Sequence, residues 1–242
     1  MEKTILTQRL MTIMKRTLLV TLVAAVFAAD SAGAAVISLS VINPGFEIDT
    51  VPAAGATGWT TSNFWTVDGT GEEDINSPQA GSNFLSADRR APNPDASQFL
   101  RSTASQNINL SVHATGIDLG MATVDIDFFV AHRDGFDDPS ATLQFFDGSN
   151  NPLGSLIDTG DVGQDDNSGN WLAATIGGGA VEVPTGARSM TLTLIATKGA
   201  GGSVIQTGFD SVSASISVVP EPGTLALLGV GGLMLLTIHR RC

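Results

Sequence analysis

The sequence predicts an all-β protein, an antiparallel β-sandwich, and three observations indicate this fold class. Short apolar or alternating segments are separated by clusters of Gly, Asn, Asp and Pro, the pattern of strands joined by tight turns. No convincing amphipathic helix occurs between residues 35 and 218. Apolar residues make up 43% of the chain, which is too much for a disordered protein, and its 242 residues allow one large β domain or two small ones.

The clearest predicted strand covers residues 122–132, where apolar side chains at 124, 126, 128 and 130 alternate with others that face the opposite side. Residues 142–146 and 152–157 flank Asp147–Asn151, whose residue types favour a hairpin turn. The other predicted strands are 36–42, 83–87, 105–110, 171–176, 180–183, 190–196 and 209–216. About eight to ten short strands at this spacing are typical of a jelly roll, which hides most sheet edges.

The N-terminus predicts a secretory signal peptide over residues 1–34, with a signal helix. Lys15 and Arg16 precede an apolar run over residues 17–29, and small residues follow, so we expect signal peptidase to cleave after Ala34. The alternative, an N-terminal membrane anchor, needs a longer apolar run. Met11 and Met14 are alternative starts to Met1, because the signal needs only the two basic residues beside the apolar run.

The C-terminus has three parts in order. The motif Val219-Pro220-Glu221-Pro222 comes first, an apolar run over residues 224–238 follows, and His239-Arg240-Arg241-Cys242 ends the chain. The run is about 22 Å long as a helix, short for a bilayer, which takes about 20 residues. Two prolines keep the motif extended and outside the helix, where an enzyme can grip it. The simple alternative is a C-terminal tail anchor with its arginines on the cytoplasmic side.

Residues 219–242 resemble the PEP-CTERM sorting signal of Gram-negative bacteria. The resemblance implies export to the cell envelope, cell surface or extracellular space, and a transmembrane helix over residues 224–238 that holds the protein in the membrane before processing. It also implies that an exosortase recognises Pro220, Glu221 and Pro222 and that the helix is then removed. Cys242 lies beyond the helix; we interpret it as a bystander, with acylation as the alternative.

The segment between the two ends, residues 35–218, is strongly acidic. The whole chain carries a formal charge of −12, but this segment retains 21 acidic and 6 basic residues, a net charge of −15. Such a charge argues against nucleic acid as a partner and suits cations, notably Ca²⁺. The single cysteine of the chain excludes an internal disulfide framework.

Several phrases within this segment carry a second resemblance. Asn43-Pro44-Gly45-Phe46-Glu47 and Gly58-Trp59 open it, residues 143–148 and 183–194 follow, and Gly208-Phe209-Asp210 lies near its end. Their order and spacing resemble the galactose-binding-like jelly rolls of many carbohydrate-binding modules, over about residues 41–216. The resemblance implies that Phe46 and Phe209 lie buried on the first and last strands, which are neighbours.

In such modules the carboxylates that match Glu47 and Asp210 help to bind a structural Ca²⁺. Calcium takes six to eight oxygen ligands, so these two carboxylates would be only part of the set. The alternative is that both are solvated or paired with arginines. Two acidic loops, residues 133–138 and 158–167, do not fit the spacing of an EF-hand, and charge-rich hairpins explain them more simply than loose calcium sites.

Sugar binding by such modules uses exposed aromatic rings, for which Trp65 and Phe136 are the candidates here, while Trp59 and Trp171 are expected in the core. Burial of Trp65 is the alternative. Catalysis finds little support, because no nucleophile or phosphate-binding motif accompanies the histidines. The sequence therefore predicts a non-enzymatic, structural or adhesive protein in an exopolysaccharide or biofilm context. A polysaccharide-binding module with a structural calcium is the alternative, and a hydrolase that uses a carboxylate pair is a third hypothesis.

Overall fold

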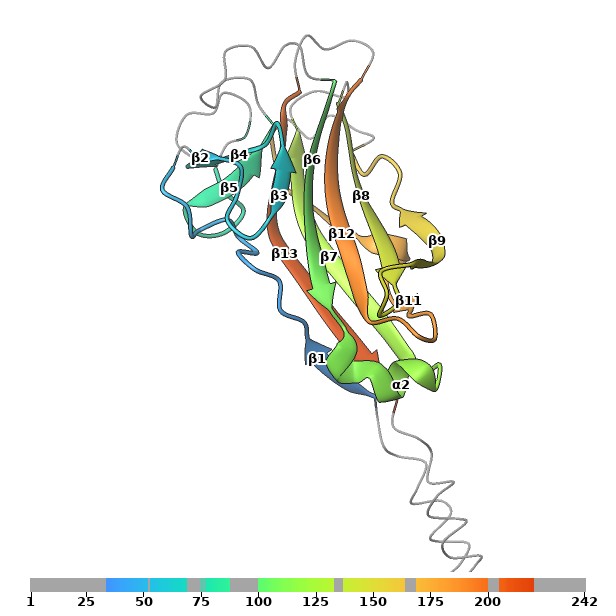
Figure 1. The fold of residues 1–242 in the computed structure, drawn as a ribbon. Helices are drawn as coiled ribbons and strands as arrows, with labels where there is room; N and C mark the ends of the chain where they lie inside the picture. Colours follow the sequence, from blue (N-terminus) through green and yellow to red (C-terminus); the bar gives the residue numbers. More distant parts are fainter. Residues whose placement is uncertain are drawn as a thin grey trace, which may run out of the picture. The chain divides into compact units, whose positions relative to one another are not determined.

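Two antiparallel β-sheets form the folded part of the chain and enclose a single main core (Figure 1). The computed structural model describes residues 34–51, 53–68, 75, 77–87, 100–132, 137–163, 169–199 and 205–219. Residues 36–218 make one compact unit. The predicted signal helix, the Pro220–Pro222 motif and the apolar run 224–238 lie outside the described residues.

The larger sheet has the order β10-β7-β13-β5-β4-β2, with β1 paired to β13 and β11 paired to β7. The first and last strands of the domain are therefore neighbours, as the sequence predicts. The strands of this sheet are β1 (Ala35–Ser38), β2 (Ala53–Ala54), β4 (Trp65–Asp68), β5 (Asn83–Ser86), β7 (Ala122–His132), β10 (Leu172–Thr175), β11 (Val181–Glu182) and β13 (Thr207–Val218).

The smaller sheet has the order β3-β6-β12-β8-β9. Its central strand, β12, pairs along nearly its whole length with β6 on one side and β8 on the other. The strands are β3 (Thr60–Ser62), β6 (Arg101–Asn109), β8 (Asp137–Phe146), β9 (Pro152–Asp158) and β12 (Ser189–Lys198). Three short helical segments complete the domain: η3 (Ser111–His113) and α2 (Ala114–Asp118) connect β6 to β7, and η4 (Ile176–Gly178) connects β10 to β11.

The alternation predicted for residues 122–132 is confirmed. Val124, Ile126, Phe128 and Val130 are all buried in the main core, whereas the residues between them are exposed or half-buried. Phe209 of β13 meets this row, with its ring 6.0 Å from that of Phe128. The period of two therefore identifies β7 as a strand with one face on the core, next to the last strand of the chain.

Three sequence predictions need correction. The strand predicted over residues 36–42 ends at Ser38, and Phe46 lies in the following turn, although its side chain is buried. The acidic loop predicted over residues 133–138 is wrong at its end, because Asp137 and Asp138 already belong to β8. Strands β2, β3 and β4 were not predicted, since they are two to four residues long and rich in Thr and Ala.

The hairpin predicted at residues 147–151 is present. Asp147 closes it with its backbone, whose N–H donates to Asn151 O at 2.9 Å, and with its carboxylate, which accepts from the N–H groups of Ser149 and Asn151. Asn150 has a positive φ of 62°, a conformation that Asn tolerates better than most residues. The turn therefore fixes the register between β8 and β9.

Candidate metal centre

The turn after β1 positions Glu47, one of the two carboxylates predicted to hold calcium. Asn43 and Phe46 have φ values of 50° and 58°, so the chain reverses sharply between them. The Phe46 ring packs against that of Trp59, with centroids 5.7 Å apart, and Trp59 Nε1 donates to Ile42 O at 3.0 Å. With Phe46 anchored in the core, the next residue, Glu47, is held on the exposed side of the turn.

A bulge in β13 positions Asp210, the second carboxylate. The pairing of β13 with β7 shifts between Asp210 and Ser213, and Ser211 takes a φ of 51°. As a result the side chains of Phe209 and Asp210, which are consecutive, are both fully buried. The N–H of Val212 donates to Pro44 O at 2.9 Å, which fixes the turn that carries Glu47 against this bulge. The alternative of a solvated Asp210 is therefore wrong.

The loop before β5 supplies backbone N–H groups to both carboxylates. Asp210 Oδ2 accepts from Gln79 N at 2.9 Å and from Ala80 N at 3.1 Å. Glu47 Oε1 accepts from Ser82 N at 2.9 Å and from Asn83 N at 2.8 Å. Four amides of residues 79–83 thus hold the two carboxylates from one loop, and Asp210 Oδ1 takes a fifth from Ser211 N at 2.6 Å.

Two glycines lie beside these carboxylates, and one of them, Gly81, is required for the close approach. A Cβ atom at Gly81 would lie 2.4 Å from Glu47 Oε1, and its φ of +70° disfavours other residues as well. A Cβ atom at Gly45 would be 3.7 Å from Asp210 Oδ1 and 3.8 Å from Glu47 Cγ, so this residue lies between the two acidic side chains. Glu47 and Asp210, 163 positions apart in sequence, therefore lie against the same loop. The calcium role that the resemblance implies for them stays a prediction.

The electrostatics of the site favour a proton or a cation. Burial raises the pKa of Asp210 from 3.8 to about 6; hydrogen bonds from Ala80, Ser211 and Gln79 act against this rise, and the charge of Glu47 adds to it. A divalent ion beside the two carboxylates would offset both the desolvation of the buried Asp210 carboxylate and its repulsion by Glu47. No group of three or more His, Cys, Asp or Glu side chains that could hold a metal occurs among the described residues. Calcium takes six to eight oxygen ligands, so these two carboxylates could supply only part of its set.

Asp49 forms a second polar centre close to this turn, which sequence reasoning missed. Its carboxylate accepts hydrogen bonds from Asn43 Nδ2 at 3.1 Å and Thr66 Oγ1 at 3.2 Å, and from both the backbone and the hydroxyl of Thr57. Burial acts to raise the pKa of Asp49, but these hydrogen bonds outweigh it and lower the pKa. Its position two residues after Glu47 is the only signal in the sequence, and it does not identify the partners.

The structure describes the remaining predicted site residues only in part. Trp65 lies in β4, where its backbone pairs with Ala54 and Ser86; its side chain, like all of Phe136, falls outside the described part of the structure. In the second acidic loop, Asp158 and Asp161 each accept from the N–H two residues ahead, which is the local bonding of a turn.

Both tryptophans expected in the core pack there to different degrees. Trp59 is buried, whereas Trp171 is only partly buried: its ring packs on Phe84, and its Nε1 donates to Ser77 O at 2.6 Å.

With this geometry defined, the chain combines a two-sheet β-sandwich with a C-terminal sorting sequence. Residues 218–241 match the family model of the PEP-CTERM protein-sorting motif. The motif implies an exported, envelope-associated protein that is processed by an exosortase. The match begins at the last residue of β13, so it covers the tail alone. Among curated proteins, none matches the chain. In the part of the chain that the structure describes, no helix has the length and apolarity to cross a membrane.

Solved structures of cyclases share the fold. A Stig cyclase, Fisc from Fischerella sp. TAU, in complex with (3Z)-3-(1-methyl-2-pyrrolidinylidene)-3H-indole, has a TM-score of 0.53 at 12% identity, over 77% of this chain and all of the cyclase chain. The C-terminal family 22 carbohydrate-binding module of Clostridium thermocellum Xyn10B has a TM-score of 0.39 at 14% identity, over 80% of this chain and 98% of the module. At 12% identity, the likeness to the cyclase shows the fold and assigns no activity to this chain.

Proposed function

We propose that this chain is a structural or adhesive protein of the cell surface or extracellular matrix, exported through its signal sequence and sorted through its C-terminal motif. One observation carries the proposal: the sorting motif follows directly after the last strand of a complete sandwich. The sandwich is then the exported domain, and the tail is the signal that sorts it. Exosortase would recognise Pro220, Glu221 and Pro222, and the apolar run would hold the chain in the membrane until it is processed.

Fractionation of cells that express an epitope-tagged chain tests this proposal. The tag is placed in the exposed turn at residues 147–151, away from both ends of the chain. We expect wild type in the envelope or extracellular fraction in a shortened form, and the deletion of residues 224–242 in the soluble exported fraction without shortening. A His239→Gln variant, which keeps the motif and the apolar run, serves as the matched control. Unchanged surface display of the deletion variant would refute the sorting role.

The non-enzymatic part of the proposal is supported by the two histidines of the domain. His132 is fully buried in β7, and His113 lies in η3, at the end of β6. Neither lies on the turn, the bulge or the loop that form the paired carboxylate site, so no histidine accompanies Glu47 and Asp210 as a general base. Turnover of a polysaccharide or a small molecule that is lost in the Asp210→Asn variant would overturn this part.

A carbohydrate-binding role is the second candidate, and the outer face of the smaller sheet favours it. On the central strand β12, Thr191 pairs with Asn107 and Gln144, and Thr193 pairs with Ser105 and Thr142. These six side chains are polar and uncharged, in a domain whose net charge is −15. Rows of hydroxyl and amide groups can donate to and accept from the hydroxyls of a neutral polysaccharide. Binding such a ligand needs no charge on the protein surface.

Binding of the domain to immobilised neutral polysaccharides tests this candidate, with and without Ca²⁺. The double variant Thr191→Val/Thr193→Val keeps the shape of both side chains and removes their hydroxyls, so we expect it to weaken retention. Thr123→Val, on β7 of the other sheet, is the matched control and should bind as wild type does. Equal retention of both variants would exclude this face as the binding surface.

A structural calcium at Glu47 and Asp210 would belong to either role. The raised pKa of Asp210 and the shared position of the two carboxylates support it. A ligand that binds only the folded state raises the melting temperature with its concentration. We therefore expect the domain to melt at a higher temperature in CaCl₂ than in EDTA, and Asp210→Asn to melt at the same temperature in both. An identical wild-type midpoint in both solutions would remove the calcium from the proposal.

A further inference from the structure

The last strand of the domain delivers the chain to the sorting tail without a linker. β13 pairs with β7 up to Val218, which lies opposite Ala122, and Val219 is the last described residue. The apolar run of the tail begins at Thr224, five residues later. Five extended residues span at most about 18 Å. If the run enters a bilayer, the end of the sandwich where β13 stops must lie within that distance of the hydrocarbon, at the level of the headgroups.

This end of the sandwich carries an unusual share of exposed apolar side chains. It is formed by β1, by the segment η3–α2 and by the end of β13 (Figure 1). Ten large apolar residues are exposed in the described part of the chain, and five of them lie here. They are Val36, Ile37, Val112, Leu119 and Val219, with exposed fractions of 70, 41, 83, 47 and 49%. We call these five the apolar rim.

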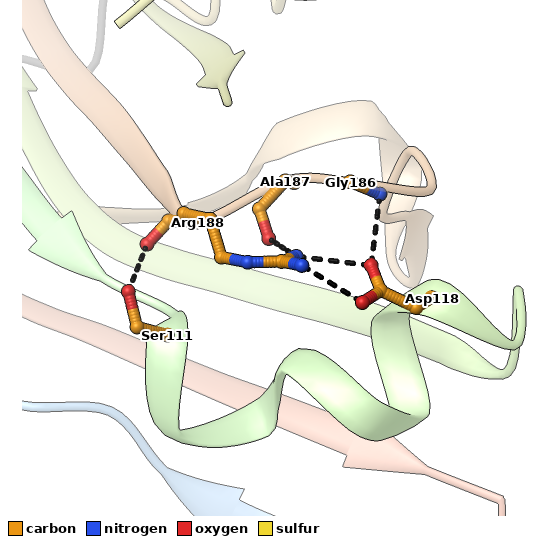
Figure 2. A network of polar contacts seen from close by, with 5 residues as sticks. All are labelled: Ser111, Asp118, Gly186, Ala187 and Arg188. Carbon is orange, nitrogen blue, oxygen red and sulfur yellow. Dashed lines mark hydrogen bonds and ion pairs between the residues drawn. The ribbon is translucent and has the colours of Figure 1, made fainter. Parts of the chain in front are cut away.

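A network of polar contacts fixes the helical part of the rim (Figure 2). Asp118 at the end of α2 accepts two hydrogen bonds from the Arg188 guanidinium, at 2.8 and 3.0 Å, and a third from Gly186 N at 3.2 Å. At the other end of the segment, Ser111 Oγ donates to Arg188 O at 3.3 Å. One arginine on the turn before β12 thus holds both ends of η3–α2, so the rim residues Val112 and Leu119 project from a fixed backbone.

The same network removes a charge that would oppose contact with lipid. Asp118 lies next to Leu119 in the rim, and Arg188 neutralises it there, which lowers the pKa of Asp118 through their hydrogen bonds. A second carboxylate at this end, Asp147, is directed into its own turn by hydrogen bonds from Ser149 and Asn151. The net charge of −15 over the whole domain still repels an anionic surface, so the fitting partner is a zwitterionic lipid surface.

We propose that the apolar rim seats the sandwich on the outer surface of the lipid bilayer while the sorting tail is inserted. The inference rests on the proposed function, because it needs the tail in the membrane. Apolar side chains at the bilayer interface bind in proportion to the area they bury there. Seating by the rim would hold the domain in one orientation, with the Pro220–Pro222 motif at the membrane surface and the β3 end of the smaller sheet directed away from it.

Fluorescence quenching by lipids tests the seating in the full chain. In a Cys242→Ser background, a single cysteine at Thr115, exposed on α2 between the rim residues, carries an environment-sensitive dye. Ser62→Cys, exposed on β3 near the far end of β6, is the control position. Reconstituted into phosphatidylcholine vesicles with spin-labelled headgroups, the dye at residue 115 should be quenched at least twofold more than the dye at residue 62. Equal quenching at both positions would overturn the proposal.

A second pair of variants separates attraction by the rim from simple tethering. A 20-residue Gly-Ser linker inserted after Val219 removes the length constraint of the tail. We expect the quenching at residue 115 to persist with the linker, and to be lost when Val112→Ser and Leu119→Ser are added to it. Loss of quenching with the linker alone would show that the short tether is the only cause and would overturn the proposal.

Further measurements distinguish failure of the seating from failure of tail insertion, from docking on exosortase and from loss of folding. Flotation of the vesicles reports whether the full chain is anchored at all; if it is not, tail insertion fails and the seating fails with it. If the chain floats but residue 115 is quenched only in membranes that contain exosortase, the rim docks on that protein and not on lipid, which also overturns the proposal. The melting temperature of the Val112→Ser/Leu119→Ser variant should equal that of wild type, because both side chains are exposed.

Discussion

The buried carboxyl of Asp210 should make the sandwich less stable as the pH rises from about 4 to 7, when no cation is bound. Burial, together with the charge of Glu47, raises the pKa of Asp210 from 3.8 to about 6, although backbone hydrogen bonds oppose the rise. Between these two values the folded state binds the proton and the unfolded state has released it. The free energy of unfolding therefore decreases with pH across this interval. At about 1.4 kcal/mol for each pKa unit, the loss is about 3 kcal/mol.

The substitution Asp210→Asn isolates this contribution. The amide has nearly the shape of the carboxyl and can still accept from Gln79 and Ala80, but it cannot ionise. Between pH 4 and pH 7, we expect the free energy of unfolding of wild type to fall by about 3 kcal/mol more than that of the variant. Urea titrations of residues 35–219 in EDTA, which contain the compact unit, measure it.

The control and the refuting outcome follow from the same structure. Asp125→Asn, on the half-buried outer side of β7, removes one carboxylate without touching the amide loop and should keep the wild-type pH dependence. Addition of CaCl₂ at pH 7 should restore stability to wild type and not to Asp210→Asn, since a cation replaces the proton. Parallel pH curves for wild type and Asp210→Asn would refute the reasoning, because Asp210 would then pay no penalty for ionising in the folded state.

Three further outcomes are expected. Gly81→Ala should lower the free energy of unfolding by about 1–3 kcal/mol and abolish any stabilisation by calcium, because its Cβ would overlap Glu47; urea titration with and without CaCl₂ measures both effects. Asp49→Ala should cost about 1–3 kcal/mol near pH 7 by leaving Asn43 and Thr57 without their acceptor, while Thr66 keeps Gly55 O. The cost should shrink as the pH falls below 3.8, because the pKa of Asp49 is lower in the folded than in the unfolded chain; melting at pH 7 and at acid pH tests this. Arg188→Ala should leave the urea midpoint nearly unchanged but increase hydrogen exchange in α2, since the exposed pair mainly fixes that segment.

The sequence predicted the strands whose side chains alternate regularly. β7 is an example, because ten of its residues pair with β13 and one of its faces lies on the core. The short strands β2 and β3 lack that signal, since their segments are rich in Ala, Thr and Ser and show no apolar alternation. Their strand conformation comes from tertiary pairing with neighbours, such as β3 with β6. The helical segment η3–α2 was not predicted either, because it too depends on a tertiary contact: Arg188, 70 residues further along the chain than Asp118, fixes it.

The candidate site was predictable only in part. Glu47 and Asp210 were predicted from a resemblance, and the structure brings them to one place. Their amide partners in residues 79–83 could not be predicted, because backbone N–H groups carry no sequence signature. The bulge that buries Asp210 also depends on register, which an isolated strand sequence does not define.

The position of β13 has a consequence for the order in which the domain can fold. β13 is the last strand of the domain, yet it lies inside the larger sheet, flanked by β7, β5 and β1. A chain that crosses a membrane from its N-terminus brings β5 and β7 to the far side first, while the strand that joins them is still inside. The larger sheet cannot close until Val218 has emerged, so the domain stays open throughout transit and completes its core only when the sorting motif arrives.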